Sequence, residues 1–320
     1  MNLFRAYFFL LFVVVFSCEK SSKLEQDISK IEVDVQVERF DLAFKNSKLK
    51  DLPKLKRDFP FIISSRVSDS IYLKVMNDTL QKELLSEVEQ TFPDFDEQIL
   101  QLRSLFQHIK YYKPMFKAPR VVTLTNDVDY RRKTLVTDSI ALIALDCFLG
   151  KEHYMYQNLP KYIATNLTKD QIVTDLAERY AEQFVFQQQR RTFLEDMIYF
   201  GKLLYFKDLM IPFKSDANKI GYAPEELAWA EANEVQIWSY FIEKELLYST
   251  DPKLANRFLS VAPFSKFYKA IDNESPGRIG QFLGWQIVRS YAENNDTSSM
   301  DILKLDPQIL FEKSYYKPKR

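Results

Sequence analysis

The first 150 residues show two different spacings of apolar side chains, one typical of strands and one of a helix. Residues 31–40 alternate apolar and polar side chains, and this period of two predicts a half-buried strand. Residues 120–125 and 134–148 are rich in Val, Ile and Leu, and the second stretch is apolar enough for one or two central strands. Residues 94–112 carry apolar side chains at helical spacing instead. The positions on that helical face are Ile99, Leu102, Leu105 and Ile109.

Helical signals dominate after Gly150. Helix starts are predicted wherever a capping pair or a first-turn proline precedes an apolar run. They are Thr168 with Gln171, Thr192 with Glu195, Pro224, Pro252, Ser275 with Pro276, and Asp306 with Pro307. The helix after Pro276 extends to about Tyr291 and carries Gly280 and Gly284, which would let another element approach closely. No repeat or Gly/Ser-rich linker divides the chain, so we expect one α+β domain over residues 31–320, with a sheet-containing N-terminal half and a helical C-terminal half.

An apolar run of eleven residues, 6–16, follows Arg5 near the start of the chain. A membrane-spanning helix needs about twenty apolar residues, so this run predicts the core of a secretory signal peptide. Ser17 and Cys18 follow, and a small residue directly before a cysteine at this place resembles a bacterial lipobox. The pattern predicts a signal peptide over residues 1–17 and attachment to a lipid membrane through an acylated Cys18. The alternative is an ordinary signal peptide with an incidental cysteine.

The residues after the lipobox cysteine are polar, and they predict a flexible tether over residues 18–30. Cys147 would be the only thiol of the mature chain besides the acylated one, so an intramolecular disulfide is impossible. Because Cys147 lies in an apolar run, we expect it to be buried and inert.

Charge and aromatic content narrow the possible partners. Forty-four basic residues balance forty-four acidic ones, which gives no field to attract nucleic acid or an anionic lipid surface. The chain also has 26 Phe and 18 Tyr. A thick core with tyrosine hydroxyls at its surface explains this content more simply than an aromatic ligand groove does.

The usual catalytic motifs are missing from the sequence. A catalytic zinc ion needs three protein ligands, but the two histidines, His108 and His153, have no ligand spacing and no Cys pair exists. No G-x-S-x-G elbow, Walker loop or G-x-G-x-x-G occurs either. We therefore expect no metal site and no small-molecule cofactor. Acidic clusters such as 225–234 and 272–275 are better explained by solvated faces and helix caps than by acid–base chemistry.

Several long and unusual strings in the C-terminal half resemble the gliding-motility lipoprotein family GldB of the Bacteroidetes. They are GYAPEELAWAEANEVQIWSYFIEKELLYSTDPKL at 221–254, APFSKFY at 262–268, DNESPGRIGQFLGWQIVRSY at 272–291 and KSYYKP at 313–318. The resemblance implies a cell-envelope lipoprotein that supports gliding and the linked type IX secretion and adhesin-transport machinery, with no known catalytic activity. Surface-exported lipoproteins of that phylum tend to carry an acidic cluster after the cysteine. Only Glu19, followed by Lys20, stands here, which favours an anchor that faces the periplasm.

The helical half is also distantly similar to zinc peptidases of the gluzincin kind, which carry H-E-x-x-H on one helix and a glutamate ligand on a later one. Placed on this chain, the two histidines fall on Ala177 and Ala181, and the later ligand falls on Phe200. Only the general-base glutamate is retained, as Glu178. The resemblance thus implies a zinc-peptidase-like domain whose metal ligands have been lost.

The residue pattern itself agrees with a site that has no metal. Apolar rows on both helices would pack against each other. They are Val173, Ala177, Ala181 and Val185 on the first helix, and Phe193, Met197, Phe200 and Leu204 on the second. We expect Phe200 to be buried there, and Glu178 to face solvent beside Thr174 and Glu182.

We therefore expect a non-catalytic, lipid-anchored envelope protein that acts through contacts with gliding or type IX secretion components. Two other classes stay open. One is a hydrolase built on carboxylates or on His108 or His153. The other is a peptide- or glycan-binding lipoprotein with a groove lined by exposed tryptophans. The candidates for that groove are Trp229, Trp238 and Trp285.

Overall fold

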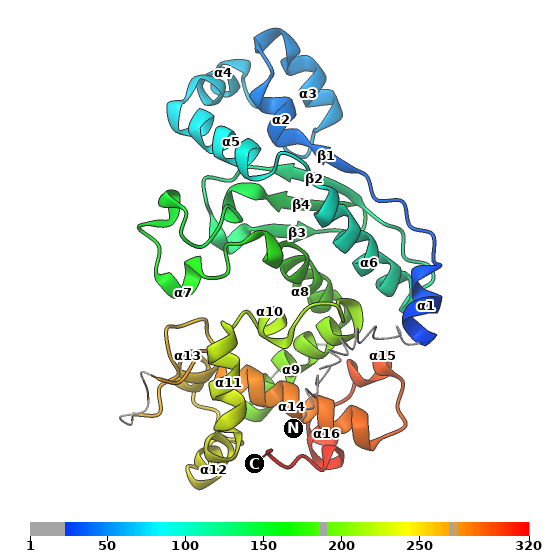
Figure 1. Cartoon of the computed structure of the whole chain (residues 1–320), viewed down its shortest axis with the longest axis vertical. Coiled ribbons are helices and arrows are strands. Elements are labelled where there is room, and N and C mark those ends of the chain that lie inside the picture. Colours follow the sequence, from blue (N-terminus) through cyan, green and yellow to red (C-terminus); the bar gives the residue numbers. More distant parts are fainter. Residues whose placement is uncertain (1–22, 186–190, 269–271, 273, 320) are drawn as a thin grey trace, which may run out of the picture.

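A computed structural model describes most of the chain, and Figure 1 shows a sheet between two groups of helices. The described residues are 23–185, 191–268, 272 and 274–319. Cys18 and the expected signal peptide therefore lie outside them. The mixed α+β architecture predicted from the sequence is confirmed, with the strands confined to the N-terminal half.

The sheet has four strands in the order β1-β2-β4-β3. They are β1 (Val37–Arg39), β2 (Arg120–Leu124), β3 (Thr134–Val136) and β4 (Ile140–Ala144). β1, β2 and β4 run parallel, and β3 pairs antiparallel with β4 at one edge. The two apolar stretches predicted as strands are confirmed. The strand expected over 31–40 is only three residues long, because the chain before Val37 passes outside the sheet.

A helical group that the sequence did not reveal covers the β1 end of the sheet (Figure 1). It contains α2 (Phe40–Lys45), α3 (Leu52–Asp58), α4 (Asp69–Asn77) and α5 (Thr79–Thr91). These helices have a small core of their own, which reaches the sheet through Val122. Its other members are Phe40, Phe44, Leu52, Leu55, Phe59, Ile63 and Leu85.

The predicted helix over 94–112 is confirmed as α6 (Asp96–Tyr112). The N-terminal segment that was expected to be a flexible tether packs against this helix. Residues 23–29 form α1 (Lys23–Ser29), which packs on α6 with Ile28 fully buried. The Gln107 side chain donates to the carbonyls of Ser29 and Ile31 at 3.1 and 2.8 Å. The tether predicted over 18–30 is therefore wrong for its second half. Contacts with residues far along the sequence hold residues 23–29 in a helix, and no local sequence pattern predicts such contacts.

The second group of helices forms the C-terminal half below β3 (Figure 1). It contains α7 (Lys161–Ala164), α8 (Ile172–Phe184), α9 (Phe193–Met210), α10 (Asp216–Ile220), α11 (Pro224–Ala232), α12 (Glu234–Glu243), α13 (Lys253–Phe258), α14 (Ile279–Asn294), α15 (Ser299–Ile302) and α16 (Pro307–Ser314). Short 3-10 turns join several elements: η1 (Leu49–Asp51), η2 (Tyr130–Arg132), η3 (Leu145–Cys147), η4 (Tyr154–Tyr156) and η5 (Lys169–Gln171). Within the described part of the chain, no helix is both long and apolar enough to cross a bilayer.

Most of the predicted helix starts are confirmed. Thr192 and Glu195 form the reciprocal capping box of α9, Pro224 opens α11, and the Asp306 carboxylate caps α16. The box predicted at Thr168 does not form, because a 3-10 turn precedes α8 and the Thr168 side chain accepts no capping bond. The helix expected after Pro276 begins three residues later, at Ile279.

The centre of the helical half is a direct backbone contact between α9 and α14. Gly284 lies against the backbone of Met197, and Gly201 lies against the backbone of Gly284. A Cβ atom on either glycine would overlap these backbone atoms. The prediction that Gly284 permits close approach of another element is therefore confirmed, and α9 is that element.

An ion network fastens α10 and α14 to α9 beside this contact. The Asp208 carboxylate accepts from the Arg289 guanidinium at 2.7 and 2.8 Å and from the Trp285 indole at 2.8 Å. Lys219 donates to the same carboxylate at 3.0 Å. Arg289 also reaches Asp216 at 2.7 Å and stacks 3.7 Å above the Trp285 ring. The network fixes α10, which carries Lys219 and ends next to the pocket described below.

We predict that Gly284→Ala destabilises the protein by about 1–3 kcal/mol or more, because a packed backbone contact must open to admit a methyl group. Urea unfolding followed by circular dichroism measures the change. The matched control is Glu293→Ala on the exposed face of the same helix, which should change stability by less than about 0.5 kcal/mol. Equal stability of the two variants would contradict the close contact.

Candidate functional site

The candidate site is a pocket of about 270 Å³ between the β3 edge of the sheet and the helical half. Its walls come from η2 and β3 on one side, from α7 and η5 above, and from α8, α9, α10 and the start of α14 on the other side. A second pocket of about 450 Å³ continues it between α9, α13 and α14. The residues that line both are Glu178, Lys207, Ile220, Val261 and Arg278.

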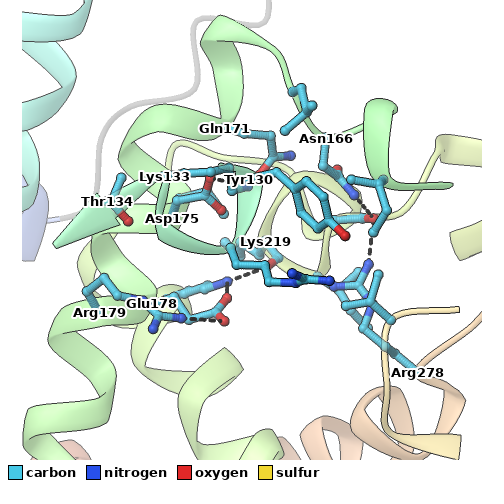
Figure 2. Close-up of a pocket in the computed structure, with 18 of the residues that line it drawn as sticks. Tyr130, Lys133, Thr134, Asn166, Gln171, Asp175, Glu178, Arg179, Lys219 and Arg278 are labelled. Carbon is cyan, nitrogen blue, oxygen red and sulfur yellow. Dashed lines mark hydrogen bonds and ion pairs between the residues drawn. The ribbon is translucent and has the colours of Figure 1, made fainter. Parts of the chain in front are cut away.

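Helix α8 has two chemically different faces, and the pocket lies on the charged one. Ala177 and Ala181 are fully buried with Val173 and Val185, as the apolar row predicts. Figure 2 shows the opposite face, where Glu178 and its neighbours project into the pocket. The hydrocarbon expected at the site therefore fills the interior behind α8. The pocket itself is lined by charged side chains.

Glu178 is held by a lysine that no sequence motif marks. The Lys207 ammonium donates to the Glu178 carboxylate at 2.7 Å and to the Lys219 carbonyl at 2.9 Å. Burial alone would raise the pKa of Glu178, but the adjacent Lys207 and Arg179 lower it to about 2. The expectation that Glu178 faces solvent is met only in part, because its carboxylate also pairs with a buried lysine. Its side chain is 39% exposed, but it is paired to a lysine that is only 4% exposed.

A second ion pair joins α8 to the sheet. Lys133, which directly precedes β3, lies 2.5 Å from the Asp175 carboxylate. Desolvation raises the pKa of Asp175, and the Lys133 ammonium opposes that rise. The pair holds the start of β3 against α8 at the border of the pocket.

Arg278 occupies the opposite wall of the pocket (Figure 2) and has an unusual backbone conformation. It lies immediately before α14 with φ at 59°, in the left-handed region that non-glycine residues rarely adopt. Its guanidinium donates to the Gly221 carbonyl at 2.7 Å and lies 5.4 Å from the Tyr222 ring centre. Asn166 donates to the same carbonyl at 2.9 Å. Strain of this kind persists where surrounding contacts fix the residue, and it clusters at binding sites.

Gly221 is the position that makes room for this arrangement. It ends α10 with φ at 71°, so glycine is favoured on conformational grounds. A Cβ atom there would lie 3.1 Å from the Arg278 guanidinium and 3.2 Å from the Asn166 amide. The glycine therefore lets both side chains converge on one carbonyl.

Other residues singled out from the sequence lie elsewhere. Phe200 lines the second pocket and is partly buried against the core, so the expectation that it is buried is met only in part. The tryptophans do not form an exposed groove: Trp285 is fully buried, and Trp229 and Trp238 are packed against the core. The buried Cys147 is confirmed, and burial raises the pKa of its thiol.

The two histidines make structural contacts in separate places. His108 is buried on α6, where its ring nitrogens contact the Ser104 carbonyl at 2.8 Å and Glu25 at 3.3 Å. His153 contacts Glu87 at 3.1 Å and stacks on Tyr154. Neither lines the pocket. Among the described residues, no three His, Cys, Asp or Glu side chains gather in a group that could hold a metal ion.

The important pocket residues that the sequence did not reveal are the cations. Lys207 lies in the largely apolar stretch LLYFKDLM. A lysine at such a position could have indicated a buried charge. Arg278 follows Pro-Gly before a predicted helix, which marks a turn but gives no direction for its side chain. Neither residue is one of the acids, histidines or cysteines from which catalytic and metal-binding motifs are built, so no motif points to them.

Comparison with known proteins agrees with the residues that suggested a family. The model of the family described as "Gliding motility protein GldB" matches residues 21–318. That description indicates a role in gliding motility, and the "lipo" in the family's short name indicates a lipoprotein of the cell envelope. No match was found among curated proteins or among solved structures.

We predict that Lys207→Met destabilises the protein by about 1–3 kcal/mol at pH 7, because it leaves Glu178 charged and unpaired. The folded-state pKa of Glu178 lies below its unfolded value of 4.5, so the pair stabilises the fold above about pH 4.5. That contribution disappears as pH falls towards 2.

The stability difference between wild type and Lys207→Met should therefore shrink from pH 7 to pH 2.5, as measured by urea unfolding at several pH values. The control is Lys304→Met, whose pair with Asp301 is exposed, so little change is expected at any pH. A difference that stays constant with pH would show that Lys207 acts through packing and not through Glu178.

Proposed function

We propose that this chain, which belongs to the gliding motility GldB family, is a non-catalytic lipoprotein anchored through Cys18 and facing the periplasm. In this role it supports gliding and the linked adhesin-secretion machinery through contacts with other proteins. Cys18 lies outside the described residues, so the anchor rests on the lipobox and on the lipoprotein family.

The pairing of Glu178 with Lys207 is the observation that carries the non-catalytic part of the proposal. A general base must accept a proton near neutral pH and must reach the water or substrate it activates. Glu178 has a pKa of about 2, and one of its oxygens is occupied by the Lys207 ammonium. A carboxylate so strongly acidic is a poor base. Its charge instead holds α8 to α9.

The positions assigned to lost metal ligands fit the same proposal. Ala177 and Ala181 have no donor atoms in their side chains, and Phe200 offers only a ring. Where a peptidase helix would present ligands, this helix uses its alanines to pack the interior. The neighbouring charged positions are engaged in ion pairs with Lys133, Lys207 and Arg179.

A role in protein contacts is supported by the shape and charge of the site. The pocket is open to solvent, and a hydrolase constellation of nucleophile and base is not found among the side chains that line it. Arg278, in contrast, is held in a strained conformation with part of its guanidinium free. Such a wall is suited to holding a partner group in place.

We predict that Cys18→Ser abolishes acyl labelling and leaves the protein soluble or uncleaved, with loss of gliding in cells of the native organism. Metabolic labelling with a palmitate analogue and membrane fractionation measure this. Cys147→Ser is the control and should keep both the label and the membrane location, because Cys147 is buried in the folded domain. Membrane attachment unchanged in Cys18→Ser, with no label in the wild type, would refute the anchor.

We also predict that Glu178→Gln keeps gliding and adhesin secretion at wild-type levels and does not alter the metal content of the purified protein. Treatment with a chelator should leave the melting temperature unchanged. Glu182→Gln, on the same helix and also paired with Arg179, is the matched control. A stoichiometric zinc ion, lost together with a hydrolytic activity in Glu178→Gln, would overturn the non-catalytic proposal.

A further inference from the structure

The distance along the chain from the proposed anchor to the first described helix limits where the folded domain can lie. Cys18 would carry the acyl chains, and α1 begins at Lys23. Successive Cα atoms are at most about 3.6 Å apart along an extended chain, so these five steps span at most about 18 Å. The start of α1 therefore lies within about 18 Å of the anchored residue. Side chains exposed around this start are the ones that can meet lipid.

The C-terminal end of α6 lies beside the start of α1 (Figure 1). The Glu25 carboxylate of α1 contacts the His108 ring of α6 at 3.3 Å. Tyr111 and Tyr112 follow His108 by about one helical turn, and their ring centres are 5.1 Å apart. Met115 is three residues further along the chain, so it lies within about 11 Å of Tyr112. The end of α6 and the loop after it are therefore held near the anchor together with α1.

Three large side chains are exposed at this place. Met115 is 84% exposed, more than any other large apolar side chain that the structure describes, and Leu24 and Tyr111 are 40% and 42% exposed. Single exposed apolar residues are common on protein surfaces. These three differ in their position, because the short connection to Cys18 keeps them close to lipid. Tyrosine is also enriched where membrane and water meet, since its ring is apolar and its hydroxyl can stay hydrated.

Basic side chains surround the three. Lys23, Lys113 and Lys117 are exposed, and none forms an ion pair with the carboxylates that the structure describes. Residues 110–119 contain no acidic residue, although the whole chain has no net charge. Both acids of α1 contact a histidine or a lysine. The acids that follow α1 lie on the segment that leads away to β1 (Figure 1). Anionic headgroups attract lysines in such a position.

We propose that these side chains form a second membrane contact, which lies on the headgroups of the leaflet that holds the anchor. We call this surface the anchor-side patch. Its members are Lys23, Leu24, Tyr111, Lys113, Met115 and Lys117. The inference rests on the proposed function, because it requires an acylated Cys18. The anchor makes the contact intramolecular, so even the weak affinity of a few side chains for lipid is enough to orient the domain.

The contact sets how the domain stands on the bilayer. Strand β2 begins at Arg120, directly after the loop of the patch, and its start pairs with the start of β4. The pocket wall made by η2 and Thr134 lies at the other end of these strands, since Thr134 pairs with Ile143 near the end of β4. A patch that faces lipid at one end of the sheet therefore leaves this pocket wall at the end away from the leaflet.

The test uses the full acylated protein, purified from membranes of the native organism and reconstituted in vesicles of phosphatidylethanolamine and phosphatidylglycerol. Leu24→Cys, Tyr111→Cys and Met115→Cys, each in a Cys147→Ser background, carry an environment-sensitive fluorophore. The acylated cysteine does not react, because its sulfur is a thioether. Lipids with a nitroxide close to the headgroup quench a fluorophore that touches the bilayer. We expect quenching at these three positions to exceed that at a control position by at least about 2-fold.

The matched control position is Leu80→Cys in the same background. Leu80 is 57% exposed, on α5 in the other helical group. Its neighbour Gln81 accepts a hydrogen bond from Thr125 at 2.8 Å, just beyond the end of β2 that lies away from the patch. A fluorophore there should not be quenched by the labelled lipid, although it is as accessible to water as those of the patch.

Charge variants test the role of the lysines. Lys113→Gln combined with Lys117→Gln should lower the quenching at Leu24→Cys by about 2-fold on the anionic vesicles. The same pair should have little effect on vesicles of phosphatidylcholine alone. Lys50→Gln combined with Lys82→Gln removes two exposed lysines of the other helical group and should change neither signal. Melting temperatures accompany each variant and show that it is folded.

The outcomes separate this inference from the proposed function. Equal quenching at Met115→Cys and Leu80→Cys, in protein that is acylated and bound to the vesicles, would overturn the patch and leave the anchor standing. Quenching at Leu24→Cys that does not change with the two patch lysines on anionic vesicles would overturn the electrostatic contact. A purified protein without acyl mass on Cys18 and without vesicle binding would instead overturn the anchor, and the inference with it.

Discussion

The direct backbone contact of α9 with α14 is the constraint on which the site depends. Because Gly201 and Gly284 carry no side chains, the two helices approach closely enough for Asp208 to meet both Arg289 and Trp285. The same carboxylate binds Lys219 and so fixes α10. The end of α10 then presents the Lys219 carbonyl to Lys207 and the Gly221 carbonyl to Arg278. Lys207 and Arg278 are thus positioned by a helix contact that lies outside the pocket.

Lys207 gives the pocket its chemical character. An ammonium that is almost fully buried needs a charged or strongly polar partner, and here it has a carboxylate and a backbone carbonyl. Pairing satisfies the lysine, lowers the pKa of Glu178 and leaves that carboxylate without proton affinity near pH 7. The negative charge of Glu178 joins α8 to α9 through its ion pair with Lys207. In this pocket Glu178 therefore acts as an ion-pair partner that stays charged near neutral pH.

Local signals decided what could be predicted from the sequence. Runs of β-branched and other apolar residues located β2 and β4, helical spacing located α6, and the Thr192–Glu195 pair located the start of α9, because each signal lies within a few residues. Gly284 was also informative, since a glycine inside a long apolar helix weakens the helix unless close packing compensates. Helix α1 was missed because its sequence is polar and its order comes from contacts with α6, about 80 residues away. The Lys207–Glu178 and Arg278–Gly221 contacts span 29 and 57 residues, so no window of sequence contains them.

The charged side chains around the pocket differ in whether they have an ion-pair partner. Around α8 the carboxylates are paired, so a cation entering the pocket would have to displace a lysine or an arginine already in place. Arg278 has no carboxylate partner in the described structure and is held in a strained backbone conformation, so an incoming anion gains an interaction without breaking an ion pair.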